Sequence, residues 1–218
     1  MLNKKYMAEF LGTFALVFCG TGAMIIDEQT HGAVSHVGVA FTFGLIVLAM
    51  IYSFGETSGA HFNPAVTLAF AVARRFDKRL ILPYIIAQGA GAFLATGVLK
   101  FLFPANLNLG STIPSGPVMQ SFVLEFILTY FLMLVIIHVS QGSKEVGIMA
   151  GFAVGSTVLL EAMFAGPISG ASMNPIRSLA PAVVSGNLQT VWIYLLAPVA
   201  GAIAAVLTWR LMNKATTK

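Results

Sequence analysis

Two stretches, SGAHFNPAVT at residues 58–67 and SGASMNPIRS at residues 169–178, decide the fold of this chain. Both contain Ser-Gly-Ala-x-x-Asn-Pro, so the second stretch repeats the first in the other half of the chain; we call them the Asn-Pro boxes. In each box the Asn directly precedes a Pro that opens a short apolar run. This is the arrangement of a helix N-cap followed by Pro at the first helical position. Asn63 and Asn174 are therefore expected to begin two short helices.

The composition around the boxes is that of an integral membrane protein. Of the 218 residues, 57% are hydrophobic and 9% are charged, whereas soluble domains carry about 25% charged residues. The formal net charge of +4 comes from basic residues in short clusters between apolar runs. Such clusters indicate membrane orientation rather than nucleic-acid binding. The single cysteine, Cys19, excludes an internal disulfide and a cysteine metal cluster.

Six apolar runs are long enough to cross about 30 Å of hydrocarbon as helices. They are Tyr6–Ile26, Gly32–Phe54, Leu80–Phe103, Val118–His138, Val146–Phe164 and Val191–Met212. The runs Pro64–Ala73 and Pro175–Val184 are too short to span and are predicted to be re-entrant half-helices. The segments that lead into them, Gly55–Phe62 and Ala165–Met173, are expected to be non-helical, and to be buried in protein or to line a water-filled cavity.

The basic residues predict the orientation of these spans. Lys and Arg within residues 4–5, 74–79, 144 and 210–218 would all lie on one side of a six-span chain. The positive-inside rule makes that side cytoplasmic, so both termini are expected to be cytoplasmic. The acidic pair at 27–28 and the long segment 104–117 fall on the opposite side.

The two halves of the chain resemble each other beyond the boxes. EFLGTF at 9–14 in the first span is echoed by EFILTY at 125–130 in the fourth. Because each half contains three spans, the second copy must be inverted, which places a binding or conduction site near the membrane midplane. We expect one transmembrane domain, residues 1–218, built from inverted repeats at about 1–103 and 118–218 and joined by the outer loop 104–117.

The fifth span carries small residues at helical spacing. Gly147, Gly151 and Gly155 would lie on one face of this helix. Small residues let neighbouring membrane helices approach closely, so this face is predicted to pack against another span.

An inverted repeat brings the two short helices in from opposite membrane faces, so that their N-termini meet near the centre. Each Asn would be held by backbone N–H groups of its own helix and could offer its side-chain amide inward, toward a water or hydroxyl oxygen. Two positive helix ends at one point, inside a low-dielectric wall, would repel cations and protons. The predicted pore centre consists of Asn63, Pro64, Ala65, Asn174, Pro175 and Ile176.

These motifs resemble the aquaporin, or major intrinsic protein, family over essentially the whole chain. The matching residues are EF-x-GT at 9–13, SG-x-HFNPAVT at 58–67 and G-x-SMNP-x-RS at 170–178. The resemblance implies an all-α membrane protein with six transmembrane helices, two re-entrant half-helices, one pore per protomer and a homotetramer. The run at 164–175 most resembles the nodulin-like branch, whose members conduct metalloids and glycerol.

The resemblance also implies a narrow outer filter at four positions, which are Phe43, Ala162, Ala171 and Arg177. Arg177 is in addition a base placed inside the apolar body, and an intramembrane charge indicates a functional site. Water-selective relatives carry His at the position of Ala162, so the methyl group here predicts a wider and less polar opening. Ile176 stands where the family usually has Ala, which bears on the pore width near the midplane.

Four further ionisable side chains allow two interpretations each. Glu9 and Glu125 are predicted to brace the re-entrant loops by accepting backbone N–H groups, with a proton relay as the alternative. Glu161 would either brace a loop or face the pore as a selectivity residue. His61 matches a family position that lines the cytoplasmic half of the pore, or it is an interior His with satisfied hydrogen bonds. No paired ligand spacing predicts a metal site, and no cofactor is expected.

The sequence therefore predicts a passive channel for water and for small uncharged polar solutes such as glycerol, urea and boric or arsenous acid, with ions and protons excluded. The alternative within this class is a water-selective aquaporin. A proton- or ion-coupled secondary carrier would also use inverted repeats and broken helices. An adhesion protein has only the acidic outer loop in its favour, and an enzyme is not expected because no nucleophile, base and orienting group cluster. The expected partners are neutral solutes, water and the lipid of a cell or plasma membrane, and no nucleic acid.

Overall fold

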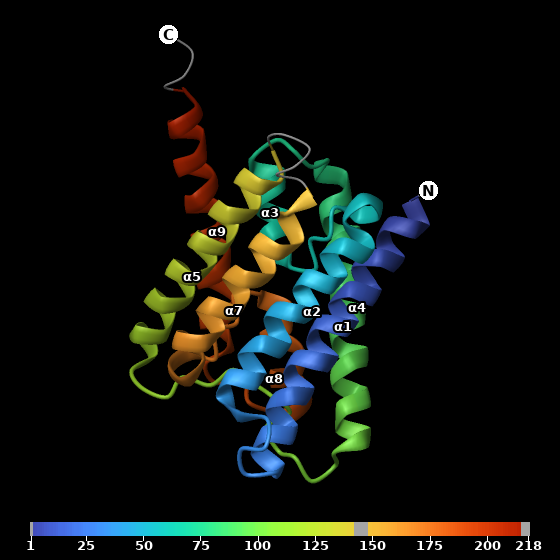
Figure 1. Ribbon diagram of the computed structural model, residues 1–218, viewed down its shortest axis with the longest axis vertical. Coiled ribbons are helices and arrows are strands. Elements are labelled where there is room, and N and C mark those ends of the chain that lie inside the picture. The colour runs from blue at the N-terminus through green and yellow to red at the C-terminus, as the bar shows by residue number, and fades with distance from the viewer. Residues whose placement is uncertain (1, 142–147, 215–218) are drawn as a thin grey trace.

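The computed structural model describes residues 2–141 and 148–214, and every secondary-structure element given for these ranges is a helix (Figure 1). The long helices are α1 (Leu2–Gln29), α2 (Ser35–Ser58), α4 (Ile81–Leu102), α5 (Val118–Val139), α7 (Ala150–Ser169) and α9 (Val191–Lys214). Each of the six is apolar and long enough to cross a membrane. The short helices are α3 (Pro64–Val72) and α8 (Pro175–Ser185), and a single 3-10 turn, η1 (Lys78–Leu80), precedes α4. The predicted all-α membrane fold is confirmed.

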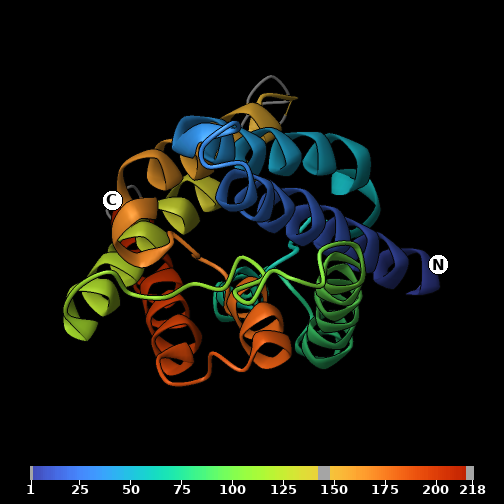
Figure 2. The same cartoon turned by 90° about the horizontal axis from the view of Figure 1, so that it is seen from below.

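The two short helices enter the bundle from opposite ends. α3 lies toward the end that carries both chain termini, whereas α8 lies toward the other end (Figure 1). The loop 104–117 crosses that other end, over the region of α8 (Figure 2). α1 packs on α4 within the first repeat, α5 packs on α9 within the second, and α2 packs on α7 between the two. Each repeat contains three long helices and one half-helix. Residues 144–147, which carry Lys144 of the predicted orientation signal and the start of the predicted fifth span, lie outside the described residues.

The packing of α4 on α1 is repeated by the packing of α9 on α5. A Cβ atom added to Gly91 of α4 would collide with the Phe10 carbonyl oxygen of α1. A Cβ atom added to Gly201 of α9 would collide with the Phe126 carbonyl oxygen of α5 in the same way. Both contacts require a residue without a side chain, because the two backbones touch.

The small-residue face of the fifth span packs against α2. A Cβ atom on Gly155 would lie 2.7 Å from the Gly44 carbonyl oxygen, and one on Gly44 would lie 2.7 Å from the Gly155 carbonyl oxygen. Gly151 lies against the ring of Tyr52, to which an added Cβ would come within 2.9 Å. The third glycine of the predicted face, Gly147, lies outside the described residues.

The segments that lead into the half-helices are shorter than the sequence predicted. Of Gly55–Phe62 and Ala165–Met173, the first parts continue the helices α2 and α7 as far as Ser58 and Ser169. Each helix ends one residue later at a glycine with φ near 86°, in the left-handed region where a glycine carries no Cβ penalty. The non-helical segments, with their N-cap asparagines, are therefore only 59–63 and 170–174.

Pro167 lies inside α7 without ending it. A proline has no N–H, so the carbonyl four residues earlier, that of Met163, loses its helical donor. His36 of α2 restores this hydrogen bond, with Nε2 lying 2.6 Å from the Met163 oxygen. Helix α7 can therefore continue past Pro167 to Ser169, which is why a non-helical segment from residue 165 was the wrong prediction.

Candidate functional site

Asn63 and Asn174 are the N-caps of α3 and α8. The Asn63 Oδ1 atom accepts a hydrogen bond from the Ala65 N–H at 2.8 Å, with Pro64 at the first helical position. The Asn174 Oδ1 atom accepts from the Ile176 N–H at 3.1 Å and from the next N–H at 3.4 Å. The local Asn-Pro signal thus produces the same helix start twice.

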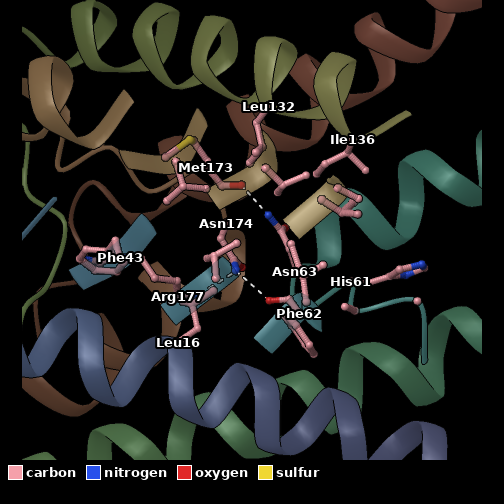
Figure 3. Close-up of a pocket in the computed structure, with 18 of the residues that line it drawn as sticks. Leu16, Phe43, His61, Phe62, Asn63, Leu132, Ile136, Met173, Asn174 and Arg177 are labelled. Atoms are coloured by element: carbon pink, nitrogen blue, oxygen red, sulfur yellow. Dashed lines mark hydrogen bonds between the residues drawn. The ribbon is translucent and has the colours of Figure 1, made fainter. Parts of the chain in front are cut away.

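Each asparagine amide also donates to the loop of the opposite repeat. Asn63 Nδ2 donates to the Met173 carbonyl oxygen at 2.7 Å, and Asn174 Nδ2 donates to the Phe62 carbonyl oxygen at 2.9 Å (Figure 3). Phe62 and Met173 both have left-handed φ values, of 48° and 53°. Since an amide nitrogen carries two N–H groups, one N–H of each asparagine remains for a solute. We expected each side-chain amide to offer both of its N–H groups to a solute. In the structure one of the two is used by the opposite loop.

Glu9 holds the loop that precedes α3. Its carboxylate is fully buried and accepts from Ser58 Oγ at 2.7 Å, from the His61 N–H at 2.9 Å and from the Phe62 N–H at 2.8 Å. Gln88 of α4 adds a fourth donor, its Nε2 lying 2.8 Å from Glu9 Oε2. These contacts are those of a loop brace.

Glu125 holds the loop that precedes α8 in the same manner. Its buried carboxylate accepts from Ser169 Oγ, from the Ser172 N–H and from the Met173 N–H, each at 2.8 Å. The hydroxyl of Tyr194 donates to the Ser169 carbonyl oxygen at 2.6 Å and completes the support. The backbone of this loop thus depends on one carboxylate from α5.

A cavity of about 130 Å³ passes the two asparagines, with Arg177 at one end and His61 toward the other (Figure 3). Much of its wall is apolar and comes from α1, α2, α5 and α7. These wall residues include Leu16, Val47, Leu132, Ile136, Val154 and Val158. A narrow apolar wall beside a few polar groups is the usual make-up of a small-molecule site.

A second cavity of about 320 Å³ lies beyond Arg177, on the side of the loop 104–117. Phe43 and Ala171 line both cavities, Arg177 lines the first and Ala162 lines the second. The four predicted filter positions are therefore brought together where the two cavities meet. The outer cavity also exposes Met24 and the acidic side chains of residues 27 and 28.

Arg177 is the buried cation of this junction, with 1% of its surface exposed. Its Nη1 atom donates to the Gly110 carbonyl oxygen at 2.8 Å, and its Nη2 atom donates to Met24 Sδ at 3.0 Å. The guanidinium carbon lies 5.0 Å from the centroid of the Phe43 ring, within cation–π range. Nε is buried and has no hydrogen-bond partner among the described residues.

Four members of the predicted pore centre lie behind the asparagines rather than in the cavity wall. Pro64, Ala65, Pro175 and Ile176 are buried in the protein at the two helix starts. Ile176 extends toward α4, where its Cδ1 would lie 3.7 Å from a Cβ atom added to Gly89. The expected effect of Ile176 on pore width is therefore corrected: the side chain occupies space left by Gly89.

His61 lines the first cavity. Its Nδ1 lies 3.1 Å from Thr67 Oγ1, and its ring stacks on Phe70 with centroids 4.9 Å apart. The ring thus borders the cavity and one nitrogen has a partner, and both a pore-lining residue and an interior His with satisfied hydrogen bonds stay predictions for His61.

Glu161 is a buried side chain of α7. The α7 side chains that border the cavities include Val154, Val158 and Ala162, and Glu161 lies beside this row, 7% exposed. Its Oε2 has no hydrogen-bond partner within the described part of the chain. A loop brace and a pore-facing selectivity residue therefore both stay predictions for Glu161.

Two partners of Arg177, Met24 and Gly110, were missed in the sequence. Met24 lies in the first repeat and Gly110 lies in the loop 104–117, both far along the chain from Arg177. No local motif marks either residue. Part of the apolar wall could have been predicted from the sequence. When the two Asn-Pro boxes are aligned, Val154 and Val158 of the second repeat correspond to Phe43 and Val47 of the first. Within the described ranges, no group of three His, Cys, Asp or Glu side chains could hold a metal ion.

Comparisons with known proteins agree with this architecture. The family model described as "Major intrinsic protein" matches residues 1–209. The chain is 47% identical to aquaporin NIP1-1 of Oryza sativa subsp. japonica, over 96% of this chain and 74% of that protein. It is 45% identical to nodulin-26 of Glycine max, over 96% of this chain and 78% of that protein.

Among solved structures, the chain is similar to the aquaglyceroporin from Plasmodium falciparum. The TM-score is 0.87 at 27% sequence identity, with 96% of both chains covered. The family match over nearly the whole sequence, the six apolar helices and the paired half-helices lead to one conclusion. The chain belongs to the major intrinsic protein family and is a multi-pass integral membrane channel for water and small solutes.

Proposed function

We propose that this channel is passive, that it conducts small uncharged polar solutes as well as water, and that it excludes ions and protons. The observation that carries the proposal is the junction of the two cavities, where a buried guanidinium faces Phe43 and the other two filter positions are alanines. Arg177 can donate to a solute oxygen while the ring and the methyl groups contact its carbon side. Glycerol, urea, boric acid and arsenous acid have this combination of polar groups and small size.

Exclusion of cations follows from the charges that surround the path. Two helix N-termini, capped by Asn63 and Asn174, direct positive dipole ends at the first cavity. Arg177 adds a full positive charge in a setting where little water can screen it. A cation would lose hydration at both points and would be repelled by these positive charges.

The remaining site residues support this path. The free N–H groups of Asn63 and Asn174 would orient the solute oxygen at the centre, and His61 would border the inner half. Glu9 and Glu125 would keep the two loops in place through the hydrogen bonds described above. Pro64, Ala65, Pro175 and Ile176 would shape the helix starts from behind.

We further propose that residues 1–218 form one channel domain that assembles as a homotetramer in a cell or plasma membrane. Both termini lie at the same end of the bundle (Figure 1), and the basic residues that cluster there favour a cytoplasmic position for that end. The long helices carry many exposed apolar side chains, which lipid or neighbouring protomers would cover.

Stopped-flow measurements on proteoliposomes test the proposed solutes. We expect flux of water, glycerol, urea and arsenous acid above that of empty vesicles, insensitive to an imposed pH gradient, with glycerol flux that saturates only at high concentration. Water flux without solute flux would favour a water-selective aquaporin instead. Solute flux that saturates at low concentration and follows the pH gradient would favour a coupled carrier.

A further inference from the structure

The guanidinium of Arg177 is held by two acceptors of unequal strength. The Gly110 carbonyl oxygen, 2.8 Å from Nη1, is a strong acceptor delivered by the loop 104–117. The Met24 thioether sulfur, 3.0 Å from Nη2, comes from α1 and is a weak acceptor. The filter arginine is therefore fixed firmly on one side and loosely on the other.

The weakly held Nη2 side of the guanidinium faces the outer cavity, through which the solute would pass. Met24 lines the outer cavity together with Phe43, Ala162 and Ala171, and its side chain is half-buried. A hydroxyl or carbonyl oxygen that arrives there is a better acceptor for the Nη2 N–H than a thioether sulfur is. The sulfur can therefore hold the donor in position and then give it up to a solute.

We infer that Met24 is a further specificity-determining residue, whose sulfur acts as a displaceable acceptor for Arg177 and so sets how strongly the filter binds a solute oxygen. This inference rests on the proposed function, because it assumes that polar solutes pass Arg177. It adds a fifth side chain, from a fifth structural element, to the four filter positions.

The strength of the acceptor at position 24 then predicts whether a substitution raises or lowers the half-saturation concentration of glycerol flux. Met24→Leu keeps the bulk but removes the acceptor, so a solute oxygen gains the Nη2 N–H without competition. The half-saturation concentration of glycerol flux should fall roughly threefold. Met24→Gln introduces an amide oxygen of similar reach, which competes with the solute, so that concentration should rise roughly threefold.

The experiment measures glycerol tracer flux into proteoliposomes as a function of glycerol concentration, beside water flux. Met50→Leu is the matched control, because Met50 is also half-buried and packs against the same apolar core as Met24, but it is not among the residues that line the outer cavity. Opposite shifts for Met24→Leu and Met24→Gln, with Met50→Leu at the wild-type value, would support the inference. If Met24→Gln does not fold, Met24→Leu against Met50→Leu decides it alone.

Two results would overturn the inference. Met24→Leu with the wild-type half-saturation concentration would mean that the sulfur has no part in solute binding. Equal loss of flux in both Met24 variants, with the concentration unchanged, would mean that the residue only fills space. Wild-type protein that conducts no glycerol would instead refute the proposed function, so the two failures are distinguishable.

Discussion

Replacing Glu125 by Gln should loosen the loop before α8 and lower both the stability of the channel and its flux. The carboxylate accepts three hydrogen bonds, each of 2.8 Å, in a fully buried position. Gln offers one oxygen and one N–H₂ group, so at least one backbone N–H of Ser172 or Met173 would then face a donor. Losing a hydrogen bond to a charged group and leaving a buried donor unpaired should cost about 2–4 kcal/mol.

The effect of Glu125→Gln should reach the pore because the same loop holds Asn63. The Met173 carbonyl oxygen accepts from Asn63 Nδ2 at 2.7 Å, so a displaced Met173 would release the asparagine of the other repeat. We therefore expect lower water and glycerol flux per folded protein, together with earlier loss of monodisperse protein on heating in detergent. Flux in proteoliposomes and size-exclusion chromatography after heating measure the two effects.

The matched control for this prediction is Glu56→Gln. Glu56 is an exposed carboxylate on α2, so the same change of charge should alter the unfolding free energy by less than about 1 kcal/mol. Glu125→Gln protein that resists heat as well as Glu56→Gln protein does, and that conducts normally, would refute the assignment of Glu125 as a loop brace.

Three further substitutions test the geometry of the filter, the midplane and the helix packing. Ala162→His should narrow the junction and lower glycerol flux roughly tenfold while water flux stays within about twofold, in the same stopped-flow assay; equal loss of both fluxes would contradict it. Ile176→Ala should destabilise the protein by about 2–5 kcal/mol yet change glycerol flux less than about twofold, because the side chain packs outside the cavity wall. Gly201→Ala should destabilise the protein by about 1–3 kcal/mol through its collision with the Phe126 carbonyl, as measured by heating in detergent. The control variant Gly97→Ala should not destabilise the protein, because nothing lies within 4 Å of a Cβ atom added there.

The sequence predicted best those features that depend on neighbouring residues alone. Asn63 and Asn174 cap their helices because the cap oxygen and the following proline are local signals. The spans were found from apolar length, but several of their bounds were misplaced: α1 runs from Leu2 to Gln29, beyond the predicted Tyr6–Ile26 at both ends. Helical hydrogen bonding continues into the polar membrane interface, where hydropathy falls.

The direction of Ile176 could have been derived from helix geometry. Residues three apart lie on the same face of a helix, whereas residues two apart do not. Arg177 is three residues after Asn174 and shares its cavity, so Ile176 must turn toward another face. The partners of Arg177 had no such signal, because Gly110 and Met24 reach it only through the tertiary fold.

The inverted repeat explains the pore, but its departures from symmetry explain the proposed selectivity. When the two Asn-Pro boxes are aligned, Arg177 stands opposite Val66 and Ala162 stands opposite Ile51, and both counterparts line the inner part of the path. Among the described residues that line the path, a buried arginine therefore lies only at the outer end, where a solute would meet its N–H donors beside the ring of Phe43. The shared hydrogen bonds of Asn63 and Asn174 join the repeats at the centre, so the helix ends that would exclude cations also hold the fold together. A change that alters solute choice without altering ion exclusion should therefore fall among the asymmetric positions.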